Sequence, residues 1–191
     1  MKIVFLITKV VTWPGAFLKG FWEHVACRTL KLRVTDRSYL PADWHCGHAR
    51  HEPAMSPARA WFLALLPYIP QRILGWLFLG ASFAPILLFG LRGKSETQWF
   101  WPELVALFLG LSLLCNSFPQ WDDAKLLWHV FYSKPDADEL EVFRPKYAGL
   151  AGKIIFAPAN AFFMAGAWLE RHGIPAFVTL AVTIAAIALK Y

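Results

Sequence analysis

The feature that most constrains this chain is the uncharged segment from Ile73 to Leu91, ILGWLFLGASFAPILLFGL. A helix needs about 20 apolar residues to cross the hydrocarbon core of a bilayer, and this segment has that length. The rest of the chain is also rich in apolar residues, with a hydrophobic fraction of 57% and a mean hydropathy of +0.42. Both values exceed what the core of a soluble domain of this size requires. The sequence therefore predicts an integral membrane protein.

Four further apolar segments accompany this run, and together they predict one all-α membrane domain, residues 1–191, with about four to five transmembrane helices. The approximate spans are 3–27, 60–91, 99–118, 154–169 and 174–189. The second span is either one long tilted helix or a short re-entrant piece that ends before Pro70 and then a full crossing. The last two spans, separated only by residues 170–173, predict a tight helical hairpin.

The first segment is ambiguous, because residues 3–27 carry Lys9, Lys19 and Glu23 and are interrupted by Trp13-Pro14-Gly15. It either crosses the membrane or lies partly in the interface. A cleaved signal peptide is disfavoured, since Lys9 ends the apolar core early and no small-x-small cleavage site follows.

Basic residues concentrate in two polar loops, residues 28–59 and 119–153. The positive-inside rule then predicts cytoplasmic loops, an outside N-terminus and a cytoplasmic C-terminus, in a plasma (inner) membrane. The net charge of +6 is dispersed between the spans rather than gathered on a basic helix, so nucleic acid is not an expected partner. The expected partners are the lipid bilayer and, in one interpretation, other membrane-protein subunits.

Histidine and cysteine gather near the first loop, where four of the six histidines fall between positions 24 and 51. Imidazole, thiolate and carboxylate groups are the ligands that zinc prefers, and an odd count of three cysteines argues against a disulfide framework. Zinc is therefore the expected cofactor. The alternative interpretation is a polar loop that is simply solvated at the membrane surface. The candidate metal ligands are His24, Cys27, Cys46, His48, His51 and Asp123.

Two acidic groups have alternative interpretations. Glu23 is the candidate catalytic base, since an ionisable group on an apolar segment costs about 2.5–3.5 kcal/mol on insertion scales and is usually paired or functional. Its other interpretation is a salt bridge with Lys19, four residues earlier. Of Asp122 and Asp123, which follow Pro119, one is expected to cap the next helix and the other to complete a metal site or to orient a ligating histidine.

Three short stretches resemble the motifs of small integral-membrane metalloproteases related to site-2 proteases. That family carries PG-x-F-L-H-E-x-x-H on a helix, then a glycine-x-x-x-His-Glu stretch, and later F-P-x-x-x-D-A after a membrane span. The corresponding stretches here are Pro14–Leu18, Gly47–Pro53 and Phe118–Lys125. The resemblance covers about two thirds of the chain and implies a zinc-dependent membrane hydrolase.

The resemblance also shows which catalytic residues are missing. When the family's first motif is aligned with Pro14–Leu18, its first histidine ligand corresponds to Lys19, its catalytic glutamate to Gly20 and its second histidine ligand to Glu23. Lysine does not replace a zinc-bound imidazole, and glycine cannot act as a general base. We therefore expect a metalloprotease-like protein that is not a peptidase of the usual type, with a degenerate or rebuilt site in which Glu23 or Glu52 is the base. The alternative is a non-enzymatic membrane subunit or scaffold. A transporter or channel is disfavoured, since the last three spans carry almost no charge.

Overall fold

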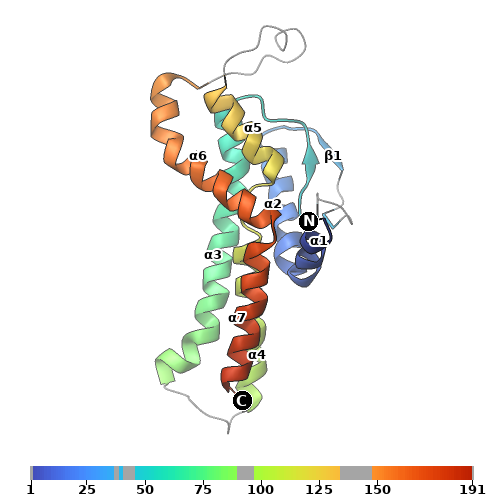
Figure 1. Cartoon of the computed structure of the whole chain (residues 1–191), viewed down its shortest axis with the longest axis vertical. Helices are drawn as coiled ribbons and strands as arrows, with labels where there is room; N and C mark the ends of the chain where they lie inside the picture. The colour runs from blue at the N-terminus through green and yellow to red at the C-terminus, as the bar shows by residue number, and fades with distance from the viewer. Residues whose placement is uncertain (1, 37–38, 41–45, 90–96, 134–147, 191) are drawn as a thin grey trace.

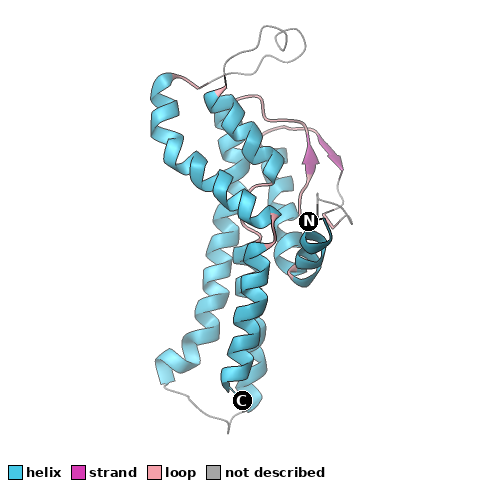
Figure 2. Cartoon of the chain, viewed as in Figure 1, coloured by secondary structure: helices cyan, strands magenta, loops and turns pink. Residues whose placement is uncertain are grey.

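The structure is a computed structural model, and it describes residues 2–36, 39–40, 46–89, 97–133 and 148–190. It is predominantly helical, which confirms the all-α prediction (Figure 2). Seven helices and one small antiparallel pair of strands lie within the described residues: α1 (Lys2–Val11), α2 (Trp13–Thr29), β1 (Val34–Asp36), β2 (Arg50–His51), α3 (Pro57–Phe89), α4 (Thr97–Cys115), α5 (Trp121–Tyr132), α6 (Leu150–Arg171) and α7 (Ile174–Lys190).

The first apolar segment is not one continuous helix. It breaks at Thr12, just before Pro14, into α1 and α2, because proline belongs in the first turn of a helix and disrupts a helix interior. Neither piece has the roughly 20 residues that a straight crossing needs. The ambiguity over residues 3–27 thus resolves into two short helices.

The second apolar segment is a single helix, α3, that runs through Pro67 and Pro70 for 33 residues. It packs closely against α4, because Gly75 and Gly110 face each other at the crossing. A Cβ added to Gly110 would lie 2.9 Å from the carbonyl oxygen of Gly75. Of the two expected forms of this span, the structure therefore has the long helix and not a separate re-entrant piece.

The expected hairpin of the last two spans does not form. Gly173, at a φ of +72°, ends α6 with a left-handed residue. Beyond it α7 continues away from α6 and packs along α4 (Figure 1). The C-terminal part of α3, together with α4 and α7, makes up one half of the elongated molecule, and the C-terminus lies at the end far from β1 and α5 (Figure 1).

The other half of the molecule contains a compact core where α2, α3, α5 and α6 meet. Its buried side chains include Cys27, Leu63, Leu127, Phe131 and Phe163. Both segments expected to be polar loops contain regular structure here: residues 28–59 include β1 and β2, and residues 119–153 include α5 and the start of α6. The charged stretch 134–146 lies outside the described residues.

Within the described residues, two helical stretches are long and apolar enough to cross a membrane, Pro57–Phe83 and Leu150–Arg171. α4 contributes a shorter apolar stretch, Trp101–Cys115. Large apolar side chains are also exposed in numbers, among them Ile3 at 73%, Leu77 at 63%, Ile155 at 68% and Phe177 at 72%. Such extensive apolar exposure is unusual for a soluble monomer.

Candidate metal site

The candidate site is built from three segments that the fold brings together: the middle of α2, the turn and strand around β2, and the first turn of α5. β1 and β2 pair with Val34 opposite His51, and the backbone N–H of Glu52 donates to the carbonyl oxygen of Arg33 at 3.0 Å. This pairing fixes residues 50–52 beside α2.

Gly47 lets the chain approach α2. Its φ of +75° is in the left-handed region that favours glycine, and an added Cβ would lie 3.0 Å from Ala16. Its N–H donates to the carbonyl oxygen of Tyr39. The glycine therefore seats the turn directly on the helix, and His48 follows it into the buried space beside Glu23.

Three of the predicted ligands converge. One donor atom from each of His48, His51 and Asp123 lies within 4.8 Å of the other two, and this group could hold a metal ion. Oδ2 of Asp123 lies 3.7 Å from Nδ1 of His48 and 3.6 Å from Nε2 of His51. The side chains are only 8%, 3% and 16% exposed for His48, His51 and Asp123.

Glu23 joins this group through His48. Its Oε2 lies 2.5 Å from Nδ1 of His48 and accepts the backbone N–H of Ala49 at 2.9 Å. The expected alternative, a salt bridge from Glu23 to Lys19, is not what the structure has, because Lys19 pairs with Glu170 instead. The carboxylate of Glu23 thus faces the histidines and is held in place by the backbone of the turn.

The electrostatics of the group follow from two imidazoles packed against two carboxylates. Burial alone would lower the pKa of both histidines, but the nearby carboxylates outweigh it. They raise the pKa of His48 above its ordinary value, and they raise the pKa of His51 to about 9. Burial likewise works to raise the pKa of Asp123, and the two histidines overcome it and hold that pKa below its ordinary value. These directions favour the protonated form of the two histidines and the ionised form of Asp123.

The remaining predicted ligands lie outside the group. The ring of His24 packs edge-on against Tyr39, at 6.0 Å between centroids. Cys27 is buried in the apolar core, and Cys46 is buried just before Gly47.

Glu52, the alternative base, is exposed. Neither expected aspartate caps α5, which begins at Trp121 without a side-chain cap. Asp122 instead faces Lys125 in an exposed pair at 3.4 Å.

A second buried polar group, which the sequence reasoning missed, lies next to the first. Oε1 of Glu170 accepts from Lys9 at 2.5 Å and from Lys19 at 2.7 Å, and its Oε2 accepts the backbone N–H of Phe118 at 3.2 Å. Lys9 also donates to Oδ1 of Asn116 at 2.7 Å. The sequence contained a signal for this group. Two lysines in one apolar segment need a carboxylate partner, and Glu170 lies at the end of another apolar segment.

Compared with protein-family models, with curated proteins and with solved structures, the chain has no match.

Proposed function

We propose that this chain is a multi-pass membrane protein with a metalloprotease-like fold, in which a rebuilt zinc site joins the β2 segment to α2 and α5 and does not hydrolyse peptides in the usual way. The observation that carries the proposal is the convergence of His48, His51 and Asp123. These residues come from the stretches on which the resemblance rests, and the membrane assignment is supported by the exposed apolar surface of the helices.

The distances suit a four-coordinate ion. Nitrogen and oxygen ligands about 2.0–2.1 Å from one zinc lie about 3.4 Å apart in a tetrahedron. The separations of 3.6 and 3.7 Å from Asp123 to the two histidines are close to that value. Glu23 is not one of the three converging groups: its Oε2 lies 2.5 Å from Nδ1 of His48, closer than two ligands of one zinc stand, so its role here would be to orient that histidine. The three protein ligands His48, His51 and Asp123 would leave the fourth position of a tetrahedral zinc to a water or another ligand.

Two features argue against ordinary peptidase chemistry. Lys19, at the position of the first histidine ligand in the resembled motif, is 1% exposed and pairs with Glu170. At Gly20, where that motif has its glutamate, an added Cβ would lie 2.8 Å from the side chain of Tyr39. The space that a general base would need is therefore filled by a tyrosine, and the expected role is non-enzymatic.

Metal analysis of the purified full-length protein tests the proposal. We expect about one zinc per chain in the wild type and a loss of most of it in the His48→Ala/His51→Ala double variant. The matched control is His24→Ala, which removes a histidine next to Glu23 on α2 that lies outside the group. This variant should keep its zinc. Zinc content that is the same in the double variant and the wild type would refute the site.

A further inference from the structure

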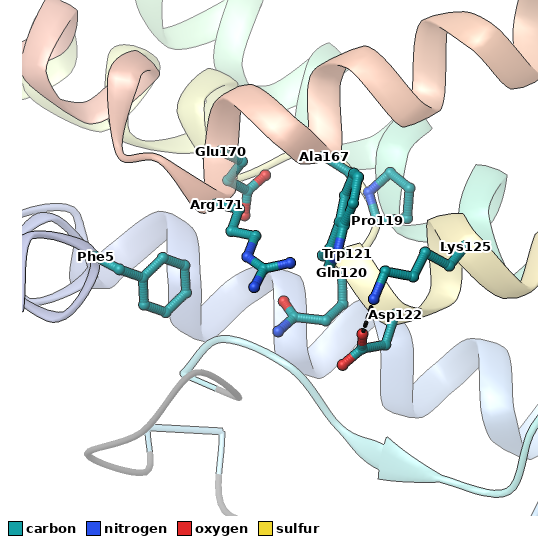
Figure 3. Close-up of a pocket in the computed structure, with 9 residues that line it drawn as sticks. All are labelled: Phe5, Pro119, Gln120, Trp121, Asp122, Lys125, Ala167, Glu170 and Arg171. Carbon is teal, nitrogen blue, oxygen red and sulfur yellow. Dashed lines mark hydrogen bonds and ion pairs between the residues drawn. The ribbon is translucent and has the colours of Figure 1, made fainter. Parts of the chain in front are cut away.

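A pocket lies at the first turn of α5, and none of the three converging metal ligands lines it. It has a volume of about 200 Å³ and is located between α1, α5 and the end of α6 (Figure 3). Phe5, Trp121, Lys125, Glu170 and Arg171 are among the residues that line it. A pocket of this volume suits a small charged group, since sites for drug-sized ligands are larger, roughly 300–1,000 Å³.

Two cations are arranged around one aromatic ring in this pocket. The guanidinium carbon of Arg171 lies 5.4 Å from the centre of the Trp121 ring, and Nζ of Lys125 also lies 5.4 Å from it. In Figure 3 the guanidinium of Arg171 extends toward Gln120, with Phe5 on its other side. Among the described residues no carboxylate forms an ion pair with Arg171. Its charge is therefore uncompensated in the pocket.

Glu170 also lines the pocket, but it does not make the pocket negative. Its Oε1 is bonded to both Lys9 and Lys19, so two ammonium groups more than neutralise the one carboxylate. Asp122 is likewise matched by Lys125. The charge that remains around the pocket is positive, which favours an anionic ligand.

Two kinds of hydrogen-bond donor complete the arrangement. α5 begins at the pocket without a side-chain cap, so the N–H groups of its first turn are directed toward this end. The indole Nε1 of Trp121 is buried and has no hydrogen-bond partner within the described residues. A buried donor without an acceptor is costly, and a bound anion would satisfy it.

We propose that this pocket binds a phosphate group, with Arg171 as the main cation and the indole N–H of Trp121 as a donor. Guanidinium groups and helix N-termini are both suited to phosphate oxygens. The surroundings favour a phosphate carried by an anionic lipid, because the adjacent helices expose apolar side chains: Ile7 on α1 is 57% exposed, and Phe177 on α7 is 72% exposed. Acyl chains would lie along these helices while the headgroup enters the pocket.

Binding to the detergent-solubilised full-length protein, measured by native mass spectrometry, tests this proposal. The probes are phosphatidylglycerol, phosphatidylcholine and inorganic phosphate. We expect wild type to prefer phosphatidylglycerol over phosphatidylcholine, Arg171→Gln to bind it about tenfold more weakly, and Trp121→Phe to bind it severalfold more weakly. Arg59→Gln, which neutralises another exposed arginine, is the matched control and should bind like wild type.

The outcomes separate the two sources of phosphate. Saturable binding of inorganic phosphate that depends on Arg171, with no preference for phosphatidylglycerol, would support the phosphate site and assign it a soluble ligand. Equal binding of phosphatidylglycerol and of inorganic phosphate to wild type and Arg171→Gln would overturn it. Size-exclusion profiles of the variants check that each is folded, and their zinc content shows whether the separate metal site is intact.

Discussion

Glu170 shows what a single side chain does in this molecule. It accepts hydrogen bonds from Lys9, Lys19 and the backbone of Phe118, and so it ties α1, α2 and the segment after α4 to the end of α6. All three charged side chains are nearly inaccessible, at 2%, 1% and 7% for Lys9, Lys19 and Glu170. A buried charge that loses its partner is strongly destabilising, whereas an exposed pair contributes little.

This asymmetry makes Glu170→Gln the most damaging single change that we predict in this cluster. It leaves two buried ammonium groups without a carboxylate, which typically costs about 3–5 kcal/mol. For a chain of this size the thermal midpoint in detergent should fall by roughly 10 °C. Lys9→Met should be milder, because it leaves Lys19 paired one-to-one with Glu170.

The matched control for this experiment is Asp122→Asn, which removes an exposed carboxylate from its pair with Lys125. Its thermal midpoint should stay close to that of wild type. If the thermal midpoint of Glu170→Gln equals that of the Asp122→Asn control, the buried ion pairs do not hold these helices together.

At the scale of elements, α6 is positioned by close contact with the chain that follows α4. Phe118 lies against Gly166, and the contact brings the ring into the space that a side chain on α6 would occupy. Nearby, Asn116 donates to Oγ1 of Thr12 at 2.9 Å and to the carbonyl oxygen of Ser112 at 2.8 Å. The segment between α4 and α5 is thus packed on both sides, and this holds the start of α5, with Asp123, near the histidines.

Gly166→Ala is expected to disturb this packing. The added Cβ would lie 2.0 Å from Cδ1 of Phe118, so the ring or the helix must shift. Overpacking of this kind typically costs about 1–3 kcal/mol, which corresponds to a fall in the thermal midpoint of several degrees. Because Phe118 lies close to Asp123 in the chain, zinc content should also fall.

Gly152→Ala, on the same helix, is the control. Its Cβ would meet only Ala148, at an ordinary 3.7 Å. Alanine is a better helix former than glycine, so this variant should be as stable as wild type or slightly more so. If the two alanine variants behave alike, the contact between α6 and Phe118 is not what positions α5.

The whole molecule is elongated, with the polar segments around β1, β2 and α5 at one end and the C-terminus at the other (Figure 1). This does not fit the expected topology, in which both long loops and the C-terminus share the cytoplasmic side. That expectation counted residues 3–27 as one crossing and the last two spans as a hairpin, and the structure has neither. The stretch Leu150–Arg171 of α6 is also long and apolar enough to cross. If α6 does not cross by itself, crossings by α3, α4 and α7 would place the loops and the C-terminus on opposite sides.

We therefore predict a cytoplasmic polar end and an external C-terminus. The basic residues of the polar end, including Arg28, Lys31, Arg33 and Arg59, place it inside by the positive-inside rule. Fused to the C-terminus of the full chain in a bacterial host, alkaline phosphatase should be active and green fluorescent protein dark. The reverse pattern would contradict the three-helix crossing and restore the topology expected from the sequence.

The sequence alone determined the fold class of this protein and the chemical type of its candidate metal ligands. Long apolar runs predicted an all-α chain, and the types of residue near positions 48, 51 and 123 predicted metal ligands, because helix-forming apolar length and donor chemistry are local properties. Only the tertiary structure decided which donors meet. His24 and Cys27 lie one and four positions after Glu23 in the chain, yet helix packing directs them elsewhere. The pairing of Lys9 and Lys19 with Glu170 depends on contacts between residues over 150 positions apart, which no local pattern specifies.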